Sequence, residues 1–388
     1  MRSRLFASGF RPTFLFAGLA ALALIPAWVA IWVFGVPLGT SWPPTLWHAH
    51  EMVFGFVGAA IAGFLLTAVP SWTDHRGFAG LPLMILVAVW FCGRLVVATG
   101  ASWPAGLVLA VDVGFLVLLA GLLAPPLLRA RSRNTPLLLV LLLLAMCNAA
   151  FHRALMRHDA SAASHSVLMA IDIALLMVTI IGGRILPAFT SSGLRASGSP
   201  AAIRVWPFTT AAALATMTAV AFVDFLWPNS RGAGVLAGIA AIVQALRLAQ
   251  WRTAATLKQP ILWVLHLGYA WLPLGLALKS AAVLGGFAGS AFWLHALTVG
   301  VLATMILGVM TRAALGHTGR PLVAQPLTVA AYVLLALATI TRVFGLSVGL
   351  AYSMVILLSA SLWTFAFAFF LWTYAPILCS PRVDGKPG

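Results

Sequence analysis

Twelve long apolar runs follow one another along the chain, with little sequence between them. A helix needs about 20 apolar residues to cross the hydrocarbon core of a bilayer, and each run is long enough. We therefore predict membrane spans at 13–34, 48–70, 80–99, 105–128, 135–157, 163–186, 203–224, 232–252, 259–284, 291–313, 322–342 and 347–376. Only 8% of the residues are charged, against about 25% in a soluble domain. The chain is thus predicted to be an all-α, polytopic membrane bundle of about twelve helices.

The connections between the runs are short and rich in Pro, Gly and Ser, as in SSGLRASGSP and GHTGRPL. They leave no room for a soluble domain, so we expect a single integral membrane domain over residues 1–388. The first run is too long for the core of a signal peptide and is read as the first span. The three cysteines lie far apart, which predicts neither a disulfide framework nor a thiolate metal cluster.

The positive charges indicate how the spans are oriented. With the N-terminus inside, the inner segments hold sixteen basic residues: Arg2, Arg4, Arg11, Arg76, Arg129, Arg131, Arg133, Arg195, Arg204, Arg247, Arg252, Lys258, Arg312, Arg320, Arg382 and Lys386. The outer segments hold three: Arg157, Arg231 and Arg342. Cytoplasmic loops carry the excess of Lys and Arg, so both termini are predicted to be cytoplasmic. This rule explains the net charge of +16 better than nucleic-acid binding does, and membrane lipid is the expected partner.

In this topology most of the histidines gather at one membrane level. The spans at 48–70, 163–186 and 291–313 enter from the outside, and they begin with His48 and His50, with His165, and with His295. His152 lies near the same face at the end of the span at 135–157. A single histidine near a helix end can simply reach interfacial water. Several ionisable groups at one depth favour a functional site, because such groups are costly inside a membrane.

Acidic and basic side chains are predicted at the same level. Glu51 follows His50, Arg94 lies in the outer half of the third span, and Asp112 lies in the outer half of the fourth. Arg94 and Asp112 are placed to form an ion pair. Asp172 follows His165 at i+7 and therefore shares a helix face with it.

His48 and His50 raise a geometric question. Residues two apart on a continuous helix point about 200° apart, since each residue turns the helix by about 100°. The two rings share one metal ion only if His48 precedes the helix in a bent segment, which Pro43 and Pro44 would favour. Otherwise they serve two neighbouring centres.

A weak internal repeat surrounds the leading histidines. Offsets of 5, 11 and 13 residues from His50 and from His295 give the same residue types, namely Gly55, Ile61 and Gly63, and Gly300, Ile306 and Gly308. His165 opens the span midway between them, so the pattern hints at three four-helix units. Recurring glycines alone would indicate only close helix packing.

Imidazole ligands suit haem iron, copper and zinc. Zinc gives little reason to place the site in a bilayer, whereas a helical bundle offers haem a dry slot between facing histidines. The chain has no CxxCH motif, so haem attachment would be non-covalent and of the b type. The haem propionates would need cations, for which Arg94, Arg153 and Lys279 are candidates.

Four segments together resemble the NnrS family: SGFRPTFLFAGLAAL, WHAHEMVFGFVGAAIAGFLLTAVPSWT, GGRILPAFT and HALTVGVLATMILGVMTRAALGHTGRPL. The resemblance covers essentially the whole chain. It implies a twelve-helix protein of the bacterial inner membrane that contains haem and copper and acts in nitric oxide metabolism, denitrification and nitrosative-stress defence. The polar positions typical of the family correspond here to His48, His50, Glu51, Arg184, His295, Arg312 and His317.

These observations lead to a set of expected roles. We expect His50 and His295 to be haem ligands with Arg94 and Arg153 near the haem, and copper to be bound by His48, His152 or His165. Glu51 would donate protons, with Asp112 and Asp172 as relays. The expected activity is binding of nitric oxide and its reduction by an oxidoreductase with an unknown electron donor. The alternatives are a non-enzymatic sensor or metal-handling protein and, third, a secondary transporter.

Overall fold

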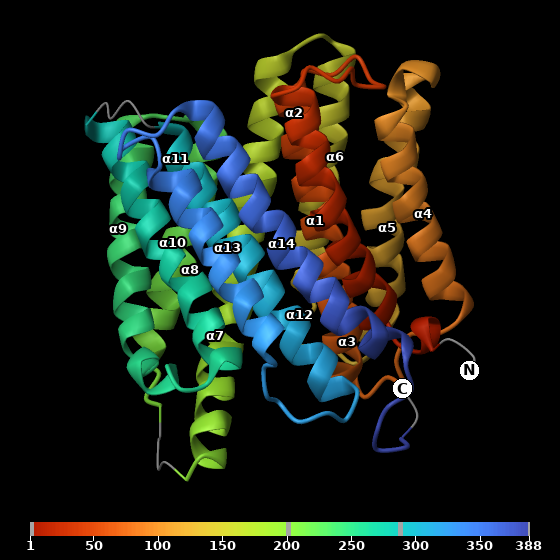
Figure 1. Cartoon of the computed structure of the whole chain (residues 1–388), viewed down its shortest axis with the longest axis vertical. Coiled ribbons are helices and arrows are strands. Elements are labelled where there is room, and N and C mark those ends of the chain that lie inside the picture. Colours follow the sequence, from red (N-terminus) through yellow and green to blue (C-terminus); the bar gives the residue numbers. More distant parts are fainter. Residues whose placement is uncertain (1–3, 199–202, 286–289, 387–388) are drawn as a thin grey trace. The chain divides into compact units, whose positions relative to one another are not determined.

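The computed structural model describes residues 4–198, 203–285 and 290–386 (Figure 1). Twelve helices in this part of the chain are long and apolar enough to cross a membrane, and the described residues contain no strand, which confirms the predicted fold class. Ten of the spans are single helices: α1 (Phe10–Trp32), α4 (Leu81–Ala98), α5 (Ala105–Arg129), α6 (Leu137–Met156), α7 (Ala160–Ala196), α8 (Pro207–Leu226), α9 (Arg231–Ala249), α10 (Pro260–Gly285), α13 (Pro326–Phe344) and α14 (Tyr352–Cys379).

The other two spans change helix type after a histidine. The second span consists of α2 (Pro44–His50), the π-helical segment η2 (Glu51–Val57) and α3 (Gly58–Thr73). The tenth consists of α11 (Ser290–His295), the π-helical segment η5 (Ala296–Ala303) and α12 (Thr304–His317). Short π segments inside α-helices are frequent at functional sites. The predicted similarity between the two histidine-led helices is therefore structural as well.

The third member of the predicted repeat differs from these two. His165 lies in α7, which is α-helical from Ala160 to Ala196 and contains no π segment over that described length. The predicted recurrence thus extends to the backbone of two helices and not to the third.

The chain divides into two compact units. Unit 1 comprises Met1–Ala170, Arg312–Pro321 and Phe367–Gly388, and unit 2 comprises Ile171–Thr311 and Leu322–Ala366. The single membrane domain stays a prediction.

In unit 1 the two ends of the described chain lie together. The Arg4 backbone N–H donates to the Cys379 carbonyl at 3.2 Å. The buried Arg11 guanidinium donates to the carbonyls of Leu378 and Ser380 at 2.8 and 2.6 Å, at the C-terminal end of α14. A cation is stabilised there by the helix dipole and by the free carbonyls of the last turn. Both ends therefore lie on one side, as an even number of spans requires.

Unit 2 contains a buried polar network around Arg247 of α9. This guanidinium donates to the Thr179 carbonyl at 2.8 Å and to the Tyr269 hydroxyl at 3.2 Å. A Cβ at Gly183 would lie 1.9 Å from its Nη2, so only glycine leaves room for the cation. The predicted topology places Arg247 among the inner charges, and the structure buries it between helices.

The end of α7 lies beyond the predicted boundary. The Ser- and Gly-rich sequence after residue 186 predicts a loop, but the helix continues to Ala196 through Pro187. Gln259 explains part of this difference, because its side-chain amide donates to the Gly193 carbonyl and to the Ser197 hydroxyl, each at 3.3 Å. A tertiary contact therefore stabilises turns that local sequence preference does not favour.

Candidate metal centre

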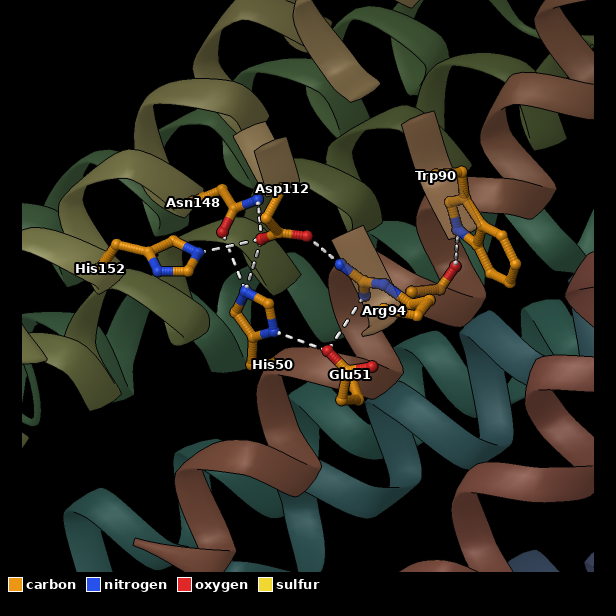
Figure 2. Close-up of polar contacts among 8 residues, drawn as sticks. His50, Glu51, Trp90, Arg94, Asp112, Asn148 and His152 are labelled. Atoms are coloured by element: carbon orange, nitrogen blue, oxygen red, sulfur yellow. Dashed lines mark hydrogen bonds and ion pairs between the residues drawn. The ribbon is translucent and has the colours of Figure 1, made fainter. Parts of the chain in front are cut away.

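Polar side chains from four spans of unit 1 meet in its interior, as Figure 2 shows. They belong to the junction of α2 and η2, to α4, to α5 and to α6, and they are His50, Glu51, Arg94, Asp112, Asn148 and His152. Except for Arg94, which is half-buried, each is at most 3% exposed. Buried ionisable groups inside a membrane protein mark a functional site by default.

Three of these side chains can hold one metal ion. His50 Nε2 and His152 Nε2 each lie 3.0 Å from Asp112 Oδ2. The three ligand atoms all lie within 4.8 Å of one another. Two imidazoles and a carboxylate form a donor set that suits copper, zinc or iron.

Asn148 holds two of these ligands in place. It lies one helical turn before His152 on the same face of α6. Its amide nitrogen donates to Asp112 Oδ2 at 2.8 Å, and its carbonyl oxygen lies 2.9 Å from His50 Nε2. Hydrogen bonds of this kind orient ligating side chains before a metal arrives. Asn148 is not among the predicted site residues, although its i, i+4 spacing with His152 is a usable signal.

Arg94 pairs with both carboxylates, as Figure 2 shows. Its Nη2 donates to Asp112 Oδ1, and its Nη1 lies 3.1 Å from Glu51 Oε1. The predicted ion pair between Arg94 and Asp112 is therefore confirmed. Two glycines make space for it, because a Cβ at Gly55 would lie 2.8 Å from Arg94 Nη1 and one at Gly93 would lie 3.1 Å from Asp112 Oδ1.

The charges of the cluster balance only with one further cation. Ionised Glu51 and Asp112 carry two negative charges, and Arg94 carries one positive charge. Burial makes a net charge expensive. A protonated His50 would restore neutrality, since its Nδ1 also lies 3.0 Å from Glu51 Oε1 and both ring nitrogens face acceptors. A bound monovalent ion such as Cu⁺ would do the same.

Aromatic rings enclose the cluster. The His50 ring lies 5.1, 4.9 and 4.7 Å, centroid to centroid, from the rings of Trp42, Phe54 and Phe151. Trp90 adds a hydrogen bond from its indole N–H to the Gly55 carbonyl of the π segment at 3.1 Å. These walls keep the polar groups in a dry environment, in which their electrostatic interactions are strong.

His48 does not join the cluster. The helix begins at Pro44, so the bent entry that would let His48 and His50 share an ion does not form. The His48 ring stacks on Trp28 of α1, with the centroids 4.6 Å apart and the planes at 22°. As expected for residues two apart on a helix, the two imidazoles point in different directions and contact different residues.

The remaining predicted residues lie elsewhere. Arg153 is exposed on α6, and His165 is half-buried on α7. His295 and Asp172 belong to unit 2, where Asp172 lies beside Asp224 and Lys279. Arg184 is exposed, Arg312 is half-buried, and the ring of His317 lies 5.5 Å from that of Phe10. Their roles stay predictions.

The donor set favours a metal ion over haem at His50. Both of its ring nitrogens face side chains, Glu51 on one side and Asp112 with Asn148 on the other. An ion fits among these groups as a replacement for a proton, whereas a porphyrin would have to displace Asp112 and Asn148 to reach Nε2. Haem ligation by His295 stays a prediction.

Comparison with known proteins identifies the family. A search of curated proteins finds no match. The family model described as NnrS protein matches residues 4–382, which is nearly the whole chain. The chain therefore belongs to the NnrS family.

Proposed function

We propose that this protein binds nitric oxide at a copper ion held by His50, Asp112 and His152, and that it reduces nitric oxide there. Membership in the NnrS family suggests a role in nitric oxide-related metabolism. The observation that carries the proposal is the group of three buried ligand atoms within 4.8 Å of one another. Copper bound there would supply a coordination site for nitric oxide and would accept single electrons.

Residues beside the proposed copper ligands would supply the protons. Reduction of two nitric oxide molecules to nitrous oxide and water consumes two electrons and two protons. Glu51 contacts both His50 and Arg94 and is the nearest carboxyl outside the ligand set. It would hold a proton for the reaction, while Arg94 and Asn148 keep Asp112 in its ligating position.

Access for nitric oxide and the supply of electrons complete the proposal. Nitric oxide is small and apolar, so it reaches a buried site through the bilayer without a polar channel. The rings of Trp42, Phe54 and Phe151 exclude water around His50. A non-covalent haem, held by His295 in unit 2, would carry electrons from an unknown donor.

The location of the protein is part of the proposal. Twelve candidate spans make the chain a multi-pass membrane protein. The excess of Lys and Arg in one set of loops supports cytoplasmic termini, and the family supports the bacterial inner membrane.

One observation favours a second function, which is the handling or sensing of metal or nitric oxide without turnover. The cluster reaches charge balance without a metal when His50 is protonated, because both of its ring nitrogens face acceptors. A site that is stable both with and without a metal ion could bind and release that ion reversibly.

Metal analysis of the purified full-length protein tests the copper site. We expect one copper per chain in the native protein and at least tenfold weaker binding in His152→Ala and Asp112→Asn, since each removes a ligand. His48→Ala is the matched control, because His48 stacks on Trp28 outside the cluster, and it should keep its copper. Equal copper content in His152→Ala and the native protein would rule out this site.

Addition of nitric oxide separates the two functions. Reduction requires steady consumption of nitric oxide with an added electron donor, and this consumption should be lost in His152→Ala. A spectral change without consumption would support sensing or metal handling. A native protein free of both copper and haem would instead favour transport.

A further inference from the structure

Unit 2 contains a second buried cluster of charged side chains, to which the proposed copper site assigns no role. Asp172 comes from α7, Asp224 from α8 and Lys279 from α10, and their exposed fractions are 6%, 8% and 3%. Three membrane-spanning helices thus each place one ionisable group at a common point. Such groups are rare in spans and usually functional.

The contacts within this cluster are specific. The Lys279 ammonium forms an ion pair with Asp224 Oδ2, and it also lies 4.9 Å from the centroid of the Trp293 ring. The Asp172 carboxyl lies within hydrogen-bonding reach of the Asp224 carboxyl and near the charge of Lys279. The charged neighbours of Asp172 in the described part of the chain include one carboxyl and one ammonium group.

A hydrogen bond between two carboxyl groups requires a proton. Ionised carboxylates only accept hydrogen bonds, so Asp172 and Asp224 form this bond only when one of them is protonated. The charge count gives the same result. With Lys279 positive, the cluster is neutral when one of the two carboxyls holds a proton, and burial penalises the doubly ionised state.

We propose that Asp172 and Asp224 form a proton-binding site inside the membrane, with one exchangeable proton shared between them. Lys279 is the positioning residue, since its ion pair keeps one carboxyl ionised and the other available for the proton. Loss of the proton leaves two carboxylates facing one ammonium group. Release of this proton is therefore favoured when another positive charge reaches the two carboxylates.

A link to catalysis rests on the proposed function. Reduction of nitric oxide consumes protons, and a buried carboxyl pair is suited to store one between turnovers. The proton site itself stands on the contacts of unit 2 and does not require copper in unit 1.

Infrared spectra of the full-length protein in lipid nanodiscs, recorded in water and in heavy water, test the site. The difference between them reports the C=O stretch of protonated carboxyl groups. Because Glu51 is also proposed to hold a proton, the variants are made in a Glu51→Gln background, where we expect a band that shifts in heavy water and is lost when Asp172→Asn is added. In Lys279→Met neutrality requires two protons, so the band should grow about twofold. Asp384→Asn is the control, because a hydrogen bond from the Arg382 guanidinium lowers the pKa of the exposed Asp384 carboxyl and keeps it ionised.

The outcomes are distinguishable from those of the copper experiment. A Glu51→Gln spectrum without the band, or a band that persists when either Asp172→Asn or Asp224→Asn is added, would overturn the proton site. Size-exclusion profiles and copper content report whether each variant folds. If the native protein holds no copper but the band follows the variants as expected, the proton site stands and the proposed function fails. A loss of nitric oxide consumption of about a hundredfold in copper-loaded Asp172→Asn would support the catalytic link.

Discussion

Arg94 shows how single residues in this protein depend on one another. Its guanidinium pairs with Asp112 and Glu51, and these carboxylates in turn face His50. In a buried network the desolvation of the charges is large, and it is offset only while each charge keeps its partners. Removal of one member should therefore cost more than the loss of a surface ion pair.

The variant Asp112→Asn tests this dependence in copper-free protein. We expect its free energy of unfolding to fall by about 3–5 kcal/mol, because Arg94 then keeps Glu51 as its sole carboxylate in the cluster. The measurement is reversible denaturation in mixed micelles. The double variant Arg94→Gln/Asp112→Asn should be destabilised by less than the sum of the two single variants. Strictly additive effects would show that the pair is not coupled.

At the scale of elements, the π segments set which residues of a span face the interior. η2 and η5 each begin directly after a histidine, His50 and His295. A π segment adds one residue to a helix locally and leaves the flanking α-helices nearly in register. The extra residue of η2 is accommodated after His50, which faces α6, and within η2 Gly55 lies against Arg94 and Trp90.

Single-residue deletions test this role. Deletion of Met52 should convert η2 to an α-helix, keep both flanks in register and leave copper bound at His50. Deletion of Phe64, which is similarly half-buried but lies in the regular helix α3, should rotate the preceding segment by about 100° and prevent folding. Yield of monodisperse protein and copper content are the measurements. The assignment fails if the two deletions behave alike.

At the scale of the whole molecule, the two ends of the chain constrain its topology. Arg4 and Arg11 bind carbonyls at the end of α14 within unit 1. Both termini are therefore on one side, and the distribution of Lys and Arg predicts that this side is cytoplasmic.

Labelling of introduced cysteines with a membrane-impermeant reagent checks the orientation. In a cysteine-free background, His158→Cys in the exposed turn between α6 and α7 should react in intact spheroplasts. Asp384→Cys in the exposed tail should react only after the membrane is permeabilised. The opposite pattern would place the termini outside.

The sequence alone determined the spans, the relative level of the polar residues and part of the site. Length and hydropathy suffice for the spans, because a bilayer leaves a chain of this composition few structures other than helices. Alternating orientation then places His50, Glu51, Arg94, Asp112 and His152 at one depth. These residues do meet in unit 1.

Only the tertiary structure decided which groups at that depth face one another. It directs His48 to Trp28 and places Asn148 between His50 and Asp112, and it joins Asp172 to Asp224 and Lys279. The physical reason is rotation about the helix axis. Hydropathy fixes how deep a residue lies in the membrane. The direction in which the side chain of that residue points depends on the lateral neighbours of its helix and, near a π segment, on a single extra residue.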